Sequence, residues 1–250
     1  MNKQNKSLIA LVSAAAGLTA GVAAYLNFAR PWILHWGATD EEIARPLPGD
    51  DLVPGAKLNA THAVTVDAPP ASVWPWLVQI GQGRGGFYSY DWIENAMGLD
   101  IHTANRILPE HQTLQVGDKI PLAADGFGVP VAILDPERAL VLHGDTRTGG
   151  EGTPPVKPGE FLAVSWGFYL DPLPDGKTRL IERWKADWTP TLPNNVFYRA
   201  FLEPGAFVME RKMLLGIKAR AERKTQVEQG CPDFDTNTTL LNLRTPYPPD

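Results

Sequence analysis

Residues 72–95, SVWPWLVQIGQGRGGFYSYDWIEN, constrain the fold more than any other part of this chain. They hold three of its eight Trp, two of its six Tyr and four of its glycines. Apolar residues recur at helical spacing behind the helix-start signal Pro69-Pro70. The glycines at 81–86 break that helix, and residues 87–97 predict a second, shorter helix. This helix, Gly-rich turn and second helix could line and cover an apolar pocket.

The same glycines offer a competing interpretation, because Gly81 to Gly86 satisfy the pattern G-x-G-x-x-G and Asp100 follows nineteen residues after Gly81. A dinucleotide site requires a strand before the glycines and a helix directly after them. The preceding segment instead carries Pro75 and two Trp at helical spacing. We therefore interpret the glycines as a hinge between two helices and expect no cofactor.

The order of the remaining elements indicates an α+β fold. A strand is predicted at 62–66, before the two helices, and short strands follow at 119–122, 129–134 and 139–143. Residues 161–170 and 178–188 alternate apolar and polar side chains on either side of Asp175-Gly176, a strong hairpin signal.

A long helix is predicted at 194–228, with Pro204 as a kink or restart. Helices and strands that are segregated along the chain favour α+β over a doubly wound sheet. We expect a curved antiparallel sheet around the long C-terminal helix, with a cavity between them as the ligand site.

Residues 7–29 carry no charged side chain. As a helix they would span about 35 Å, enough for a hydrocarbon core of about 30 Å. We expect a retained single-pass anchor, with a cleaved signal peptide as the alternative. The chain would then lie in the cell membrane, with its soluble domain outside the cytoplasm.

Ser13, Gly17 and Gly21 stand four residues apart in this run, a spacing that permits a homodimer through closely packed helices. Trp32 and Trp36 follow the run and could either form an interfacial aromatic belt or pack on the domain. We therefore divide the chain into an anchor at 1–36, a linker at 37–60, a domain at 61–228 and a Pro/Thr-rich tail at 229–250.

Composition excludes several classes of function. The net charge of −5 and the sequence pI of about 5.6 disfavour nucleic acid as a partner. A single Cys cannot form an internal disulfide. The histidines at 102, 111 and 143 lack the spacing of metal ligands, so we expect no metal.

The candidate ligand-binding residues are aromatic and polar side chains that such a cavity could face. Tyr and Trp give polar handles in an apolar wall, and Glu94 and His102 could move protons. Arg84 either caps a helix C-terminus or anchors a ligand headgroup. Because adjacent strand residues face opposite sides, only one of Glu182 and Arg183 can face the cavity. The full set is Trp76, Arg84, Tyr88, Tyr90, Trp92, Glu94, His102, Trp166 and Arg183.

VDAPPASVW at 66–74, the helix–turn–helix after it and the terminal helix resemble the START-like superfamily, also called SRPBCC or polyketide cyclase/dehydrase-like, over residues 60–226. WGAT at 36–39, LPGD at 47–50 and RGGFYSYDWIEN at 84–95 are similar to signatures of a bacterial group with an N-terminal membrane span. The resemblance implies a helix-grip fold with a hydrophobic cavity. It transfers no catalytic residue.

We therefore expect a membrane-tethered domain that binds a lipid or another hydrophobic small molecule. The alternative is a cyclase, dehydratase or hydrolase that uses the same cavity. It predicts that two titratable side chains from Tyr88, Glu94, His102, His143 and Arg183 meet in one pocket. A weaker third interpretation is a structural module whose cavity is filled by side chains.

Overall fold

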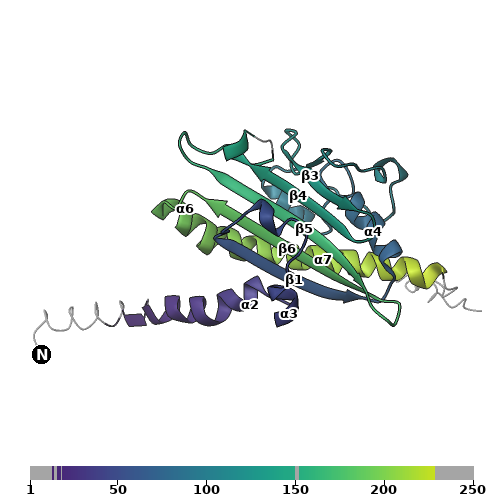
Figure 1. The fold of residues 1–250 in the computed structure, drawn as a ribbon, viewed down its shortest axis with the longest axis horizontal. Coiled ribbons are helices and arrows are strands. Elements are labelled where there is room, and N and C mark those ends of the chain that lie inside the picture. The colour runs from purple at the N-terminus through teal and green to yellow at the C-terminus, as the bar shows by residue number, and fades with distance from the viewer. Residues whose placement is uncertain (1–12, 14–15, 18, 150–151, 229–250) are drawn as a thin grey trace, which may run out of the picture.

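The structure is a computed structural model that describes residues 13, 16–17, 19–149 and 152–228. Six antiparallel strands form a curved sheet in the order β1-β6-β5-β4-β3-β2 (Figure 1). The strands are β1 (Leu58–Val66), β2 (Lys119–Pro121), β3 (Gly128–Asp135), β4 (Ala139–Asp145), β5 (Leu162–Pro172) and β6 (Thr178–Trp188). The predicted hairpin is confirmed, since β5 and β6 pair along their whole length with Leu170 opposite Leu180.

The helices are α2 (Arg30–Leu34), α3 (Asp40–Ala44), α4 (Pro70–Val78), α5 (Asp91–Ala96), α6 (Leu192–Val196) and α7 (Glu203–Glu228). π-Helical turns precede α2 at η1 (Tyr25–Ala29) and α7 at η5 (Phe197–Leu202), and short 3-10 turns are η2 (Asp50–Leu52), η3 (Pro109–His111) and η4 (Thr146–Thr148). The α+β class, the antiparallel sheet and the long C-terminal helix are therefore as predicted.

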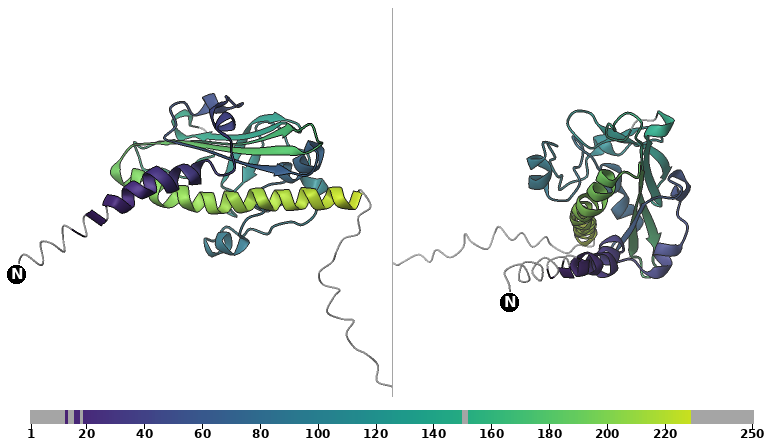
Figure 2. Two further views of the ribbon diagram at one scale, coloured as in Figure 1. Left: turned by 90° about the horizontal axis from the view of Figure 1, so that it is seen from below. Right: turned by 90° about the vertical axis from the view of Figure 1, so that its left-hand side faces the viewer.

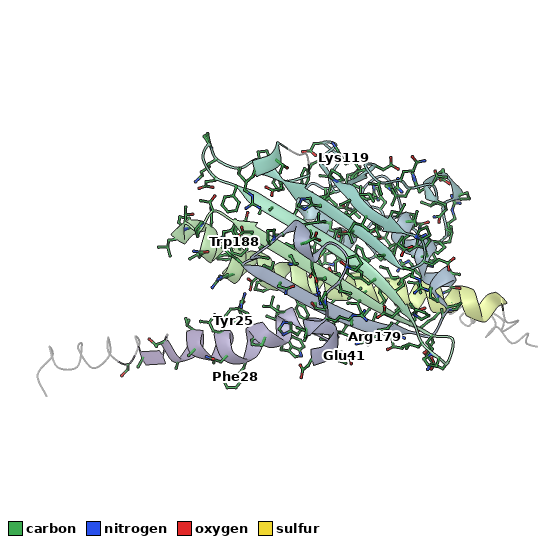
Figure 3. All side chains as sticks on the ribbon, viewed as in Figure 1. Tyr25, Phe28, Glu41, Lys119, Arg179 and Trp188 are labelled. Atoms are coloured by element: carbon green, nitrogen blue, oxygen red, sulfur yellow. The ribbon has the colours of Figure 1, made fainter. Side chains whose placement is uncertain are left out.

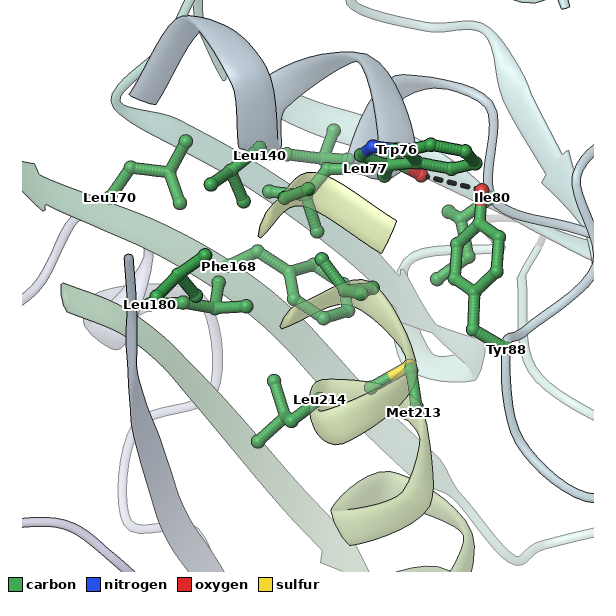
Figure 4. Close-up of a cluster of buried hydrophobic side chains, with 14 of the residues drawn as sticks. Trp76, Leu77, Ile80, Tyr88, Leu140, Phe168, Leu170, Leu180, Met213 and Leu214 are labelled. Carbon is green, nitrogen blue, oxygen red and sulfur yellow. Dashed lines mark hydrogen bonds between the residues drawn. The ribbon is translucent and has the colours of Figure 1, made fainter. Parts of the chain in front are cut away.

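The long helix α7 runs along the concave face of the sheet (Figure 2). Alternate strand residues face it, so Phe168, Leu170 and Leu180 pack with Leu214 of α7 in the main core. Helix α4 covers one end of this core with Trp76 and Leu77, and Ile80 joins them just after the helix ends (Figure 4). The opposite strand faces carry a separate apolar cluster that includes Ala63, Val141, Tyr169 and Ile181.

Residues 36–55 cover that opposite, convex face. The Arg183 guanidinium, which is 3% exposed, donates to the Thr61 hydroxyl, the Asp50 carboxylate and the backbone carbonyls of Glu42, Ile43 and Arg45 at 2.7–3.1 Å. Such a fork uses all the hydrogen-bonding nitrogens that an arginine has. The segment expected as a linker at 37–60 thus carries α3 and η2, is fixed to the sheet and contributes the first residues of β1.

The contacts of residues 36–50 show what the motifs WGAT and LPGD do in the structure. Thr39 and Glu42 form a capping box at the start of α3, and both Glu42 oxygens accept from Arg179 (labelled in Figure 3) at 2.6 and 2.8 Å. Asp50 accepts from the backbone N–H of Leu47 at 2.8 Å and from Arg183. Glu42 and Asp50 thus bind residues 36–50 to Arg179 and Arg183 of the sheet.

The N-terminal helical segment lies beside β1 and α7 (Figure 2). Arg30 forms a two-pronged ion pair with Glu203 at 2.8 and 3.0 Å, and the Tyr25 hydroxyl donates to the Arg199 carbonyl at 3.0 Å. Trp32 and Trp36 both contact the Phe207 ring, although Trp32 remains 58% exposed. These aromatic side chains therefore do pack on the domain.

No helix within the described part of the chain is long and apolar enough to cross a membrane. The predicted anchor at 7–29 falls partly outside the described residues. Ser13, Gly17 and Gly21 are exposed, so the expected homodimer through them stays a prediction.

Two predicted helices differ from the structure. Only Asp91–Ala96 of residues 87–97 are helical, because Tyr88 adopts φ 58°, which a helix cannot accommodate. The helix predicted at 194–228 is present and runs without a gap through α6, η5 and α7 from 192 to 228, with an irregularity before Pro204, which has no N–H to donate. The chain absorbs that missing bond in the π-helical turn η5, where the Glu203 N–H donates to the Tyr198 carbonyl, and α7 continues directly from it.

Candidate functional site

A cleft of about 340 Å³ lies between α7, α5 and the strands β2 and β5. This volume falls in the range of small-molecule pockets. In Figure 2, α5 reaches past α7 on the side away from the sheet, so the loop that carries it forms the outer wall. Most of the lining is apolar, and three polar residues interrupt it. The lining residues are Phe87, Ser89, Glu94, Met97, Leu99, Leu122, Trp166, Ala206, Met209, Glu210 and Met213.

One stripe of α7 forms the floor of the cleft. Ala206, Met209, Glu210 and Met213 are spaced three or four residues apart and therefore share one helix face. Unbranched methionine side chains adapt to ligands of different shape. Glu210 is the single ionisable group on this stripe.

Hydrogen bonds from Arg84 and Tyr88 hold the loop at 81–90 against residues 76–80, so the outer wall of the cleft has a defined position. Arg84 donates to the carbonyls of Ile80 at 3.2 Å and Val78 at 2.9 Å, and so caps the C-terminus of α4. The Tyr88 hydroxyl donates to the Trp76 carbonyl at 2.9 Å (Figure 4). Of the two roles left open for Arg84, the structure shows the cap.

Close approach of backbone brings the same loop onto α7. A Cβ at Gly216 would overlap the carbonyl oxygen of Tyr88. The Arg220 guanidinium covers the Tyr88 ring at 5.0 Å. Gly81 and Gly86 pair as an isolated bridge after a helix, not after a strand. The glycines therefore form a turn, and the context of a dinucleotide site is absent.

Glu94 of α5 is the buried acid of the outer wall. It is 4% exposed, and one carboxylate oxygen accepts from the Ser89 hydroxyl. Its other oxygen, Oε2, is buried and has no hydrogen-bond partner. Burial raises the pKa of the Glu94 carboxyl, while the Ser89 hydrogen bond opposes that rise. A buried oxygen without a partner is costly, which makes it a natural contact for a ligand.

Glu210 connects the cleft to a second polar group beneath it. His62 of β1 and Glu182 of β6 are directly opposite in the sheet register, and His62 Nδ1 lies 2.9 Å from Glu182 Oε2. The same nitrogen lies 3.4 Å from Glu210 Oε2. Trp166 completes the pair by donating from Nε1 to Glu182 Oε1 at 2.6 Å.

These contacts set the charge of the group. Burial disfavours a charged imidazole, but the hydrogen bond and the charge of Glu182 outweigh burial and raise the pKa of His62 to about 9. Both ring nitrogens then donate, Nε2 to the Ile33 carbonyl at 2.8 Å. Burial and the neighbouring Glu182 carboxylate raise the pKa of Glu210 well above its ordinary value. The geometry thus favours a His62–Glu182 ion pair beside a Glu210 whose protonated form is favoured by burial.

His62, Glu182 and Glu210 could also hold a metal by position, since their ligand atoms all lie within 4.8 Å of one another. The hydrogen bond from Nε2 to Ile33 is of the kind that orients a metal-bound histidine. However, Nδ1 already has a carboxylate partner, and the ion pair satisfies the ring without a metal. We therefore describe the group as an ion pair with a flanking acid.

The sequence-predicted residues separate into four groups. Glu94 and Trp166 line the cleft, while Trp76 and Tyr88 are buried behind it with their rings 5.9 Å apart. His102 and Trp92 are exposed, and His102 pairs with Asp100 at 3.1 Å. The remaining candidates, Arg84, Tyr90 and Arg183, do not line the cleft.

The titratable pair that the enzyme interpretation required does not form from the named set. Only Glu94 of that set lines the cleft, whereas Arg183 lies on the convex face with residues 42–50.

Sequence reasoning missed His62 and Glu210. Glu210 falls three residues after Phe207 and four before Leu214, on the apolar stripe of α7, and that spacing was the available signal.

Comparisons with known proteins give distant structural likenesses only. No family model matches the chain, and no curated protein matches it. The aromatase/cyclase Zhui from Streptomyces is 19% identical with a TM-score of 0.37, covering 68% of this chain and 96% of its own. A hypothetical protein from Helicobacter pylori is 13% identical with a TM-score of 0.42, covering 74% and 98%. A conserved protein from Geobacillus kaustophilus is 14% identical with a TM-score of 0.38, covering 67% and 97%.

Proposed function

We propose that this protein is a membrane-tethered helix-grip domain that binds a lipid or another hydrophobic small molecule in the cleft between α5, β5 and α7. The observation that carries the proposal is the cleft itself. It offers about 340 Å³ lined by Phe, Trp, Leu and Met side chains with a few convergent polar groups, the composition of a ligand pocket rather than of a packed core.

The tether is supported by the sequence and by the exposed surface next to it. The uncharged run at 7–29 contains Phe28 near its end and is followed by Trp32, and these two side chains are 77% and 58% exposed. At the same end of the molecule, Leu192, Phe197 and Phe201 are 77%, 54% and 67% exposed (Figure 1). Large exposed aromatic side chains beside a membrane span suit the bilayer interface.

The direct experiment is extraction of the purified full-length protein with organic solvent, followed by mass spectrometry. Recovery of a stoichiometric apolar compound supports the proposal. Absence of any such compound, together with no binding of a hydrophobic fluorescent dye, contradicts it. Co-flotation with liposomes tests the tether separately, because it requires the run at 7–29 and not the cleft.

An enzyme of the cyclase, dehydratase or hydrolase type is the second candidate. Two carboxyl groups, Glu94 and Glu210, face the same cleft, and burial raises the pKa of each. Carboxylic acids whose pKa is raised by burial are suited to proton transfer. Incubating the recovered ligand with fresh protein tests this candidate. Gain or loss of one water by the ligand, abolished in Glu210→Gln, would favour catalysis, whereas an unchanged mass favours binding alone.

A further inference from the structure

The cleft carries one acid on its outer wall, one on its floor and no basic side chain among its described lining residues. Glu94 stands on α5 and Glu210 on α7, and the lining named above contains no Lys, Arg or His among the residues that the structure describes. We propose that the cleft selects apolar molecules that carry a cationic amine head, with Glu94 and Glu210 as the anchors of that head. This inference rests on the proposed binding function and names the class of its ligand.

The unpartnered oxygen of Glu94 is the first reason. Glu94 is 4% exposed, and its Oε1 accepts from the Ser89 hydroxyl. Its Oε2 is buried and accepts no hydrogen bond. A buried carboxylate oxygen without a donor is expensive. An ammonium group supplies both a donor and a positive charge, and charge-assisted hydrogen bonds are the strong ones.

The second reason is the charge beneath Glu210. The nearest cation is His62, at 3.4 Å from Oε2, but its Nδ1 is already shared with Glu182 at 2.9 Å. The imidazolium charge is thus already balanced by Glu182, and Glu210, whose protonated form burial favours, has no counter-charge of its own with which to ionise. An amine in the cleft would supply the missing charge, and an anionic ligand would add to the deficit.

The third reason is the pair of aromatic side chains in the lining of the cleft. Phe87 and Trp166 both line the cleft with ring centroids 6.5 Å apart. Aromatic faces attract ammonium groups, more strongly where water is excluded. The Met side chains at 97, 209 and 213 remain for the apolar body of the ligand. Acid and aromatic groups together favour an amine over an alcohol of the same length.

The test compares three ligands of one chain length on the full-length protein. Decylamine, decan-1-ol and decanoate are titrated by calorimetry. We expect decylamine to bind at least about tenfold more tightly than decan-1-ol, with decanoate weakest. Decanoate binding as tightly as decylamine would overturn the inference while leaving the binding function intact. Binding of none of the three would overturn both.

Variants locate the preference. Glu94→Gln and Glu210→Gln are each expected to lower the affinity for decylamine about three- to tenfold, and so to lower the ratio of decylamine affinity to decan-1-ol affinity. The exposed Glu110 does not line the cleft, so Glu110→Gln is the control and should change neither affinity. Retention of the full amine preference in both cleft variants would assign the preference to another site and refute the proposal.

Discussion

His62 Nδ1 lies 2.9 Å from Glu182 Oε2, and Nε2 of the same ring lies 2.8 Å from the Ile33 carbonyl oxygen. One buried imidazole therefore joins three parts of the molecule. It holds the N-terminal segment to the first strand, pairs that strand with β6, and stands behind Glu210 of α7. The charge beside Glu210 in the cleft and the stability of the domain consequently both depend on whether His62 is protonated.

This proton predicts that stability falls at alkaline pH. The pKa of His62 is raised from 6.5 to about 9 in the folded protein, so the stabilisation is complete below pH 6.5 and is lost as pH rises through 9. Over that window the free energy of unfolding should fall by roughly 3 kcal/mol, since one pKa unit corresponds to about 1.4 kcal/mol. Glu210 acts in the same direction, because its pKa is also raised. Urea unfolding at several pH values measures the slope, and His62→Gln should flatten it. An equal slope in both proteins would show that other groups carry it.

The N-terminal helical segment should be required for full stability of the domain. A chain that begins at residue 38 lacks Arg30 and Ile33, the partners of Glu203 and His62. Glu203, whose side chain is fully buried, would then lose its counter-charge, at a cost of at most about 3–5 kcal/mol, because water can reach the carboxylate once the segment is gone. A chain that begins at residue 20 keeps both partners and serves as the control. Equal unfolding midpoints for the two chains would contradict the arrangement of this segment.

Two glycines of α7 should respond to alanine with opposite signs. Alanine is favoured over glycine within helices by up to about 1 kcal/mol. At Gly205 nothing lies within 4 Å of an added Cβ, so Gly205→Ala should stabilise the protein. At Gly216 the Cβ would overlap the Tyr88 carbonyl oxygen, so Gly216→Ala should destabilise it by about 1–3 kcal/mol. Thermal unfolding compares them, and stabilisation by both would show that the loop does not press on α7.

Arg183 should tolerate no replacement, even by lysine. Lysine cannot reproduce the planar fork that reaches Asp50 and the carbonyls of residues 42–45. Buried carbonyls left without donors cost about 1–3 kcal/mol each, so Arg183→Lys should lower the free energy of unfolding by about 3 kcal/mol. Arg223 is exposed on α7, and Arg223→Lys should stay within about 0.5 kcal/mol of the parent protein. A similar small change at both sites would mean that residues 36–55 are held mainly by their apolar contacts.

The sequence predicted the fold well because the relevant signals are local. Strand alternation at 162–170 and the Asp175-Gly176 turn suffice to place the hairpin, and Pro204 marks the start of α7. Local signals also identified Glu94 and Trp166 as residues of the cleft. The shorter α5 could not be foreseen, because the positive φ of Tyr88 follows from contacts with Trp76 and Gly216, which are distant in the sequence.

The group beneath the cleft was missed for a different reason. His62 and Glu182 are 120 residues apart, and they meet only because β1 pairs with β6, which no local pattern specifies. Arg183 was preferred to Glu182 as a site residue, yet the strand phase places Glu182 with Leu180 and Trp184 on the concave face. Residues 37–50 show no strand or long-helix pattern in the sequence. Their backbone carbonyls are bound by the side chains of Arg179 and Arg183 and not by the backbone of a neighbouring strand.

The central claim is that the cleft on α7 is the ligand site, and filling it tests that claim most directly. Ala206 lines the cleft, while Val208 on the same helix is 48% exposed and does not. A hydrophobic fluorescent dye is titrated into the full-length protein and into the variants Ala206→Trp and Val208→Trp, with circular dichroism as the check on folding. We predict that Ala206→Trp loses at least about tenfold in dye affinity, by occupying the space a ligand needs, and that Val208→Trp binds as the parent does. Equal dye affinity in all three folded proteins would contradict the claim.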